Sequence, residues 1–125
     1  MSMLVFVYGT LKRGGCYHGY LRSARYVSAN RSAYRFTMLN LGPYPGVIDR
    51  GNSAIFGEIY LIDHNTLLKL DQLEDYPRTY TRRTIRTQYG PAWIYLYQLA
   101  VGREPVIRDG NWRMTKNQTS SSRGT

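Results

Sequence analysis

Cysteine is nearly absent from this sequence: Cys16 is the only one among 125 residues. A single thiol cannot form an intramolecular disulfide or supply a cysteine-based zinc site. Long hydrophobic runs are also missing, since no stretch approaches the ~20 apolar residues that a membrane-spanning helix requires. The first residues carry no basic region ahead of a hydrophobic stretch, as an export signal would. We therefore expect a cytoplasmic protein that has no membrane partner.

Acidic residues are few, with 8 Asp and Glu against 17 Lys and Arg, and the net charge is +9. This excess, together with 12 tyrosines that could stack on bases, is compatible with an RNA-binding protein. The basic residues are scattered, however, and only Lys12-Arg13 and Arg82-Arg83 are adjacent. Dispersed charge favours solubility and weak nonspecific attraction, so we expect no specific nucleic-acid partner. A positive field would also attract an acidic small molecule.

Two phosphate-binding motifs are missing, although the chain begins in a way that would suit them. Residues 3–8 form an apolar run rich in β-branched and aromatic residues, which predicts a buried central strand. Gly9, Thr10 and Gly14-Gly15 follow, and the backbone N–H groups of such a turn can hold an anion. The spacing is neither that of a Walker loop nor that of GxGxxG. From this pattern alone, a core strand that ends in an ordinary turn is the alternative.

The clearest helix is predicted over residues 64–74, with Asp63 as N-cap and Pro77 beyond its end. At about 100° per residue, Glu74 projects from the apolar stripe of this helix, while Asp71 and Asp75 turn toward solvent. A carboxyl on a core-facing stripe is costly, and its burial raises its pKa, which suits a general base. The alternative is a Glu74 side chain that swings outward at a frayed helix end.

The remaining segments alternate like strands, over residues 24–33, 34–39, 53–62, 80–88 and 92–99. Residues 41–46 hold two prolines and two glycines, which predicts a rigid loop that excludes an interior strand. The loop either offers Tyr44 to a ligand or is a rigid turn with an ordinary half-buried tyrosine. Tyr80 and Tyr97 are the strand aromatics that we expect nearest a pocket. Glu58 shares a face with aromatic residues and is expected to be a hydrogen-bonded structural acid.

At least five short strands and one helix predict an α+β fold, a small, mainly antiparallel β-barrel, closed or nearly closed, with one or two packed helices. We expect a single domain over residues 1–114. A tail at residues 115–125 has no apolar residue and is expected to be disordered.

Several blocks resemble the γ-glutamylcyclotransferase-like family, especially its short bacterial members and γ-glutamylamine cyclotransferase. The blocks are residues 5–14, 41–46, 56–60, 70–77 and 80–82. The resemblance implies a small β-barrel with helices and a pocket at one mouth. It implies a small-molecule γ-glutamyl substrate whose α-carboxylate and α-amine are held by the loop of Tyr8, Gly9, Thr10 and Leu11, and it requires no metal or cofactor. Glu74 would act as base and then acid while the α-nitrogen of a γ-glutamyl amine or amide attacks its γ-carbonyl and forms 5-oxoproline. The oxyanion would need a donor, a backbone N–H or a tyrosine hydroxyl.

Two further interpretations remain open at this point. A noncatalytic module that binds a glutamyl-like small molecule would use the same loop without a buried base. Cys16 could act as a nucleophile with His18, but the pair lies in a glycine-flanked loop with no third orienting group in view, which favours an ordinary free thiol. The leaving amine and the oligomeric state are not specified by these patterns.

Overall fold

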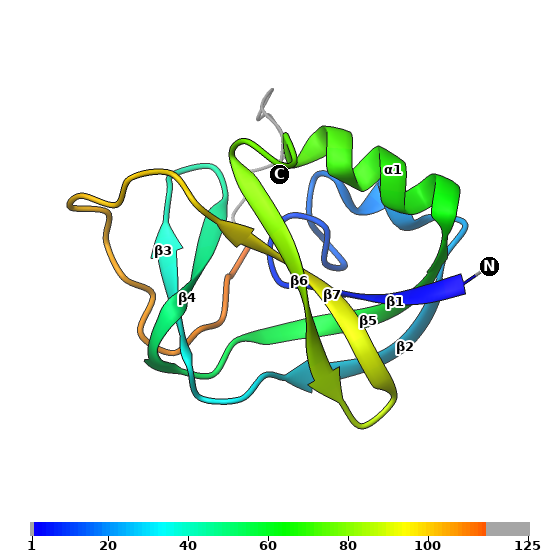
Figure 1. Cartoon of the computed structure of the whole chain (residues 1–125), viewed down its shortest axis with the longest axis horizontal. Coiled ribbons are helices and arrows are strands. Elements are labelled where there is room, and N and C mark those ends of the chain that lie inside the picture. Colours follow the sequence, from blue (N-terminus) through cyan, green and yellow to red (C-terminus); the bar gives the residue numbers. More distant parts are fainter. Residues whose placement is uncertain (1, 115–125) are drawn as a thin grey trace.

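The computed structural model describes residues 2–114, in which seven β-strands form two sheets (Figure 1). The strands are β1 (Ser2–Val7), β2 (Arg25–Arg31), β3 (Phe36–Asn40), β4 (Pro45–Ser53), β5 (Phe56–Asp63), β6 (Tyr80–Thr87) and β7 (Gly90–Tyr97). An α-helix, α1 (His64–Leu73), follows β5, and a short 3₁₀ helix, η1 (His18–Leu21), precedes β2. The tail expected at 115–125 lies outside the described residues.

Strand β1 is the centre of the larger sheet, whose strand order is β2-β5-β1-β7-β6. It pairs antiparallel with β5 and parallel with β7, so that Val5 faces Tyr60 on one side and Trp93 on the other. The β1–β7 pair is the parallel one, and the other pairs of this sheet are antiparallel. The buried central strand predicted from the apolar run is confirmed.

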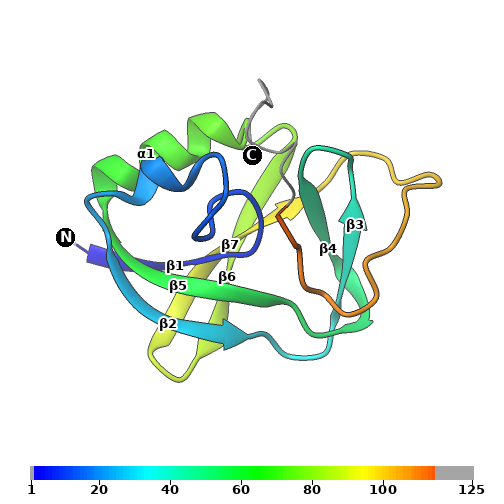
Figure 2. The ribbon, with the colours of Figure 1, turned by 180° about the vertical axis from the view of Figure 1, so that it is seen from behind.

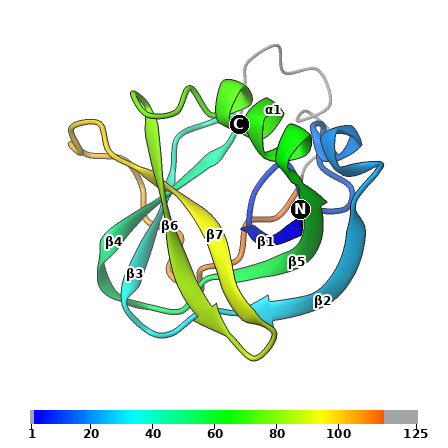
Figure 3. The same cartoon turned by 45° about the vertical axis from the view of Figure 1, so that its right-hand side comes forward.

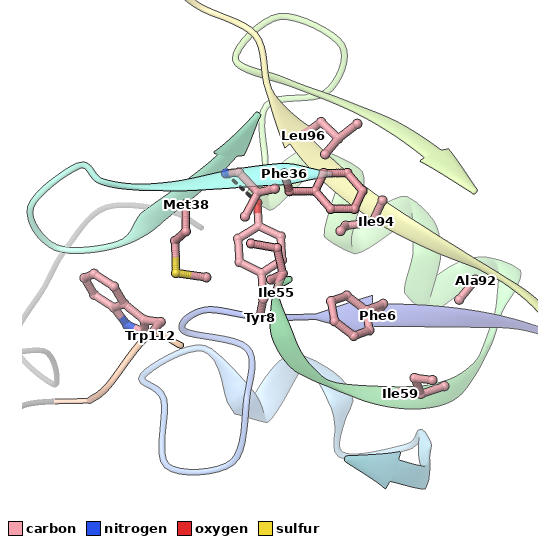
Figure 4. Close-up of a cluster of buried hydrophobic side chains, with 11 residues drawn as sticks. Phe6, Tyr8, Phe36, Met38, Ile55, Ile59, Ala92, Ile94, Leu96 and Trp112 are labelled. Atoms are coloured by element: carbon pink, nitrogen blue, oxygen red, sulfur yellow. Dashed lines mark hydrogen bonds between the residues drawn. The ribbon is translucent and has the colours of Figure 1, made fainter. Parts of the chain in front are cut away.

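Both faces of β1 are buried, because alternate side chains enter different hydrophobic clusters. Phe6 belongs to a cluster that also contains Phe36, Met38 and Val47 of the β3–β4 sheet (Figure 4). Val5 and Val7 pack on the opposite face against Leu70 of α1 and Leu21 of η1. In Figure 2, α1 and the β3–β4 sheet accordingly lie on different sides of β1. Three layers of structure thus meet at this strand.

The predicted barrel is wrong, because the strands form an open sheet and a separate pair. The edge strands of the larger sheet are β2 and β6, and Figure 3 shows how the sheet curves between them. Strands β3 and β4 pair only with each other among the described strands. Since α1 covers one face of the sheet and β3–β4 cover the other, the apolar faces are buried by layering and closure is not needed. The α+β class with mainly antiparallel pairing is confirmed.

Two local predictions have different outcomes. The carboxylate of Asp63 accepts a hydrogen bond from the backbone N–H of Thr66 at 2.8 Å, which confirms the N-cap of α1. Residues 41–46 are not entirely a loop, because Pro45 and Gly46 open β4 and pair with Asn40 and Leu39. Proline is tolerated there because β4 belongs to a two-stranded sheet and has a free edge. Within residues 2–114 no helix combines the length and apolar character needed to cross a membrane.

Helix α1 offers a direct test of this packing. Leu70 is fully buried against β1, whereas Leu68 on the outer side of the same helix is 47% exposed. We expect Leu70→Ala to lower the free energy of unfolding by about 2–5 kcal/mol, because it leaves a cavity in the core. Leu68→Ala should change it by less than about 0.5 kcal/mol. Urea denaturation of the two variants measures the difference, and equal effects would contradict the packing described here.

Candidate functional site

The chain leaves β1 through a tight loop that is fixed by its glycines. A Cβ atom on Gly9 would lie 2.8 Å from the ring of Pro45, and one on Gly15 would lie 2.0 Å from the carbonyl oxygen of Thr10. Glycine is therefore required at both positions by close approach. The backbone N–H of Tyr17 donates to the Thr10 carbonyl at 3.1 Å, and that of Arg13 donates to the Glu58 carboxylate at 3.0 Å. The loop is thus held against its own second half and against β5.

The loop has the features of an anion site that the sequence suggested. Among the described residues, the backbone N–H groups of Gly9 and Leu11 have no hydrogen-bond acceptor. Thr10 between them is buried and takes part in interactions of its own. Backbone N–H groups without partners at a buried position favour a negatively charged or carbonyl-bearing ligand.

Glu74 lies at the C-terminal end of α1 and points into the protein, where it is 5% exposed. Its burial raises the pKa of the carboxyl to about 8, because desolvation penalises the charged form. Within residues 2–114 no Lys, Arg or His forms an ion pair with it. Near neutral pH a proton can therefore move onto and off this carboxyl at small cost, which is the property of a general acid–base group.

A turn directly after Glu74 ends the helix. Asp75 has a φ of +54°, which stops the helical path, and its carboxylate accepts a hydrogen bond from the hydroxyl of Thr79 at 2.8 Å. The backbone N–H groups of Arg78 and Thr79 donate to the Asp75 carbonyl. This turn holds the end of α1 in place, so Glu74 is not at a frayed terminus.

Glu74 and the loop after β1 line one cavity. Its walls are formed by Phe6, Val7, Tyr8, Gly9, Thr10, Leu11, Pro45, Glu74 and Tyr95. The volume open to water is about 20 Å³, which is room for about one water molecule. The structure therefore brings together five residues selected from the sequence, namely Tyr8, Gly9, Thr10, Leu11 and Glu74.

The other three predicted site residues lie outside the lining of this cavity. Tyr80 is buried, and its hydroxyl donates to the carbonyl of Pro45 at 2.9 Å, so it supports a wall from behind. Tyr97 packs edge-on against Tyr80 with ring centroids 5.5 Å apart. Tyr44 is half-buried in the turn before β4. The expected contact of these three tyrosines with a ligand stays a prediction.

Tyr95 is a polar lining residue that was not among the predicted site residues. Alternation puts it in an aromatic stripe on β7 together with Trp93 and Tyr97, but alternation shows only which face a residue shares and not what that face meets. The carbonyl of Tyr95 accepts a hydrogen bond from the Tyr8 hydroxyl at 2.7 Å. The hydroxyl of Tyr95 donates to the Asp71 carboxylate at 2.6 Å. The stripe itself was the available signal.

The expectation that Asp71 turns toward solvent is wrong. Its side chain is 13% exposed, and both of its oxygens accept hydrogen bonds from Arg82, at 2.8 and 3.0 Å. The guanidinium of Arg82 lies between the rings of Tyr76 and Trp93, 4.6 and 4.4 Å from their centroids. Helical spacing did not predict this position, because it depends on Arg82 of β6, whose ion pair makes the partial burial of Asp71 tolerable.

The remaining polar candidates have structural roles. Glu58 accepts hydrogen bonds from the Tyr60 hydroxyl and the backbone of Arg13, as expected for a structural acid. The ring of His18 is bound to the carbonyl of Leu11, and partial burial raises the pKa of the Cys16 thiol. A raised pKa opposes the thiolate that a nucleophile requires. In the described part of the chain, His, Cys, Asp and Glu form no cluster that could hold a metal ion.

Known proteins resemble this chain over most of its length. The family model described as "Gamma-glutamyl cyclotransferase, AIG2-like" matches residues 5–114. A protein of Vibrio cholerae, provisionally named gamma-glutamylcyclotransferase, is 42% identical to this chain over 112 residues. The match covers 90% of this chain and 96% of that protein. The gamma-glutamylcyclotransferase family protein YtfP of Escherichia coli K12 is 36% identical over 110 residues, or 88% of this chain and 96% of that protein.

Solved structures share the fold. The solution structure of E. coli YtfP has a TM-score of 0.72 at 37% identity and covers 88% of this chain and 96% of that one. An uncharacterised protein of Pyrococcus horikoshii has a TM-score of 0.77 at 22% identity over 87% of this chain and 88% of that one. By the extent of the family match and the identity to these relatives, the chain belongs to the gamma-glutamyl cyclotransferase, AIG2-like family.

Proposed function

We propose that this protein cyclises a γ-glutamyl amine or amide to 5-oxoproline and releases the amine. The observation that carries the proposal is the buried carboxyl of Glu74, with a pKa of about 8, in one cavity with the loop of Tyr8 to Leu11. Recognition of a glutamyl group alone would need no desolvated carboxyl. A residue poised near pH 8 suits a reaction in which a proton is first removed and then returned.

The reaction requires the α-nitrogen of the substrate to attack its own γ-carbonyl carbon. At neutral pH this nitrogen is an ammonium and has no free electron pair. Glu74 in its carboxylate form removes a proton, the C–N bond of the five-membered ring forms, and the bond to the leaving amine breaks. The ring nitrogen gives up two protons in all and the leaving group takes up two, with Glu74 as carrier, so the amine departs as an ammonium ion.

The loop after β1 would supply the other half of the site. The N–H groups of Gly9 and Leu11 point to a role in holding the α-carboxylate or the developing oxyanion. Held at this end, the glutamyl chain would fold into a ring-like conformation that brings nitrogen and carbonyl carbon together.

A glutamyl group is larger than the cavity, so we infer that the walls separate on binding. Pro45 is the wall residue contributed by the start of β4, next to the turn at residues 41–44. Its ring lies close to Gly9, since a Cβ atom on Gly9 would be 2.8 Å from it. Movement of this turn would open the cavity without disturbing the central strand.

The reaction is tested by release of 5-oxoproline from a panel of γ-glutamyl amines, γ-glutamyl amino acids and glutathione. We expect turnover of at least one compound and a loss of about 10²–10⁴-fold in kcat for Glu74→Gln, because the base is removed while its shape is kept. Glu104→Gln is the matched control, since its carboxylate lies outside the cavity and accepts a bond from Gly102. Absence of turnover on every compound, with tight binding of one of them, would replace the enzyme by a binding module.

The pH dependence of kcat/KM follows from the raised pKa of Glu74. The free enzyme must hold Glu74 as carboxylate, and below pH 8 most of it is protonated. We expect kcat/KM to rise about tenfold per pH unit below pH 7 and to level off above pH 8. Rates measured from pH 5 to 9.5 decide this, and a plateau that already begins near pH 5 would show that Glu74 is not the base.

Stability provides a test that needs no substrate. The pKa of Glu74 is about 8 in the folded protein, against ~4.3 for an unperturbed glutamate. Between these values the folded state holds a proton that the unfolded state lacks, so wild-type stability falls as the pH rises through this window. Gln has no such proton. We therefore compare the melting temperature of Glu74→Gln with that of the wild type at two pH values. We expect the difference, variant minus wild type, to be larger by several degrees at pH 8.5 than at pH 4.5, since ~1 kcal/mol corresponds to about 4 °C. A difference that is independent of pH would refute a raised pKa.

A further inference from the structure

The hydroxyl protons of the tyrosines around the cavity are all given to protein acceptors. The Tyr8 hydroxyl donates to the backbone carbonyl of Tyr95 at 2.7 Å, and the Tyr80 hydroxyl donates to that of Pro45 at 2.9 Å. The Tyr95 hydroxyl donates to Asp71 at 2.6 Å. A tyrosine has one such proton. None of these three hydroxyls is therefore available to donate to a substrate carbonyl.

The acceptor of the Tyr95 proton is fixed as a carboxylate. Arg82 binds both oxygens of Asp71 and is itself held between two aromatic rings. Arginine carries donors and no acceptor, so Asp71 is the acceptor in both bonds with Arg82. It also accepts the proton of the Tyr95 hydroxyl, and this hydrogen bond would be lost if that proton turned toward the cavity.

The Tyr95 hydroxyl oxygen keeps lone pairs that can accept a hydrogen bond, and in this it differs from the Tyr8 hydroxyl oxygen. The Tyr8 oxygen already accepts from the backbone N–H of Val47 at 3.3 Å. Within residues 2–114 no donor to the Tyr95 hydroxyl oxygen is found. Tyr95 and Glu74 line the same cavity.

We propose that the hydroxyl oxygen of Tyr95 accepts a hydrogen bond from the α-ammonium group of the substrate, and that Asp71 and Arg82 are positioning residues that hold it in this accepting role. The proposal rests on the proposed cyclisation and names the group that selects its substrates. A phenol oxygen whose own proton is given to Asp71 can only accept hydrogen bonds. It therefore favours γ-glutamyl compounds with a free α-amine over analogues that lack the amine.

The same contact would serve the chemical step. After Glu74 has taken one proton, the neutral amine keeps two hydrogens and one lone pair. A hydrogen bond from one of these hydrogens to Tyr95 restricts rotation about the Cα–N bond, so the lone pair can be directed at the γ-carbonyl carbon. No proton passes to Tyr95, whose own proton stays with Asp71.

The test compares two probes that differ only at the α-carbon. The probes are γ-glutamyl-n-butylamide and the mono-n-butylamide of glutaric acid, which lacks the amine but keeps the carboxylate and the amide. Binding is measured by calorimetry in the Glu74→Gln background, where turnover does not interfere. Tyr95→Phe removes only the oxygen and leaves Asp71 paired with Arg82. Tyr60→Phe is the matched control, because Tyr60 is also buried and also donates to a carboxylate, that of Glu58, away from the cavity.

We expect Tyr95→Phe to weaken binding of the amine-bearing probe about tenfold or more and to change binding of the other probe less than twofold, as for loss of a bond to a charged group. Tyr60→Phe should preserve the preference for the amine. Equal weakening of both probes would assign Tyr95 a merely structural role, and unchanged binding of both would overturn the proposal as well. If the variant does not fold, 3-fluorotyrosine at position 95 makes the same test, because fluorine weakens the oxygen as an acceptor.

The outcomes separate this inference from the proposed function. Turnover of γ-glutamyl compounds by the wild type, with an amine preference that Tyr95→Phe leaves intact, overturns the role of Tyr95 alone. A preference that disappears in the variant, without turnover of any compound by the wild type, supports Tyr95 and overturns the enzyme. Failure of both probes to bind overturns both.

Discussion

The structure depends on the burial of β1 on both faces. A strand with apolar side chains on both sides must be covered twice, and α1 and the β3–β4 sheet provide these covers. Because both covers extend past the end of β1, the loop that follows lies between helix α1, the start of β4 and β7. The cavity is thus a consequence of how the core is closed at that end.

The carboxyl of Glu74 is the costly part of this arrangement. A charged group at 5% exposure without an ion-pair partner is strongly disfavoured, so the side chain is largely a neutral acid at pH 7. A few residues away, the partly buried Asp71 instead forms a bidentate ion pair with Arg82. Two carboxyls one helical turn apart therefore lie in different environments, and the difference comes from one guanidinium.

The sequence alone predicts the local features and the residues that carry chemistry, but not their long-range partners. The apolar run of β1, the Asp63 cap and the inward position of Glu74 each follow from a pattern within ten or so residues. Whether β2 and β6 meet to close a barrel depends on pairings between distant strands, which no local pattern specifies. The prediction that Asp71 faces solvent failed for the same reason, since its partner Arg82 lies on β6, outside the helix. Tyr95 was missed because the alternation of side chains along a strand does not show what lies opposite that strand.

The parallel pairing of β1 with β7 has a consequence for how the site comes into being. Val5 and Trp93 are neighbours in space although most of the described chain lies between them, so their contact closes a long loop. The cavity walls come from residues near positions 8, 45, 74 and 95, and no fragment that stops short of β7 contains them all. Detachment of β7 would let water reach Glu74 and return its pKa toward the ordinary range of a glutamate. The raised pKa of Glu74 is therefore a property of the folded chain as a whole, and it would be lost if β7 detached.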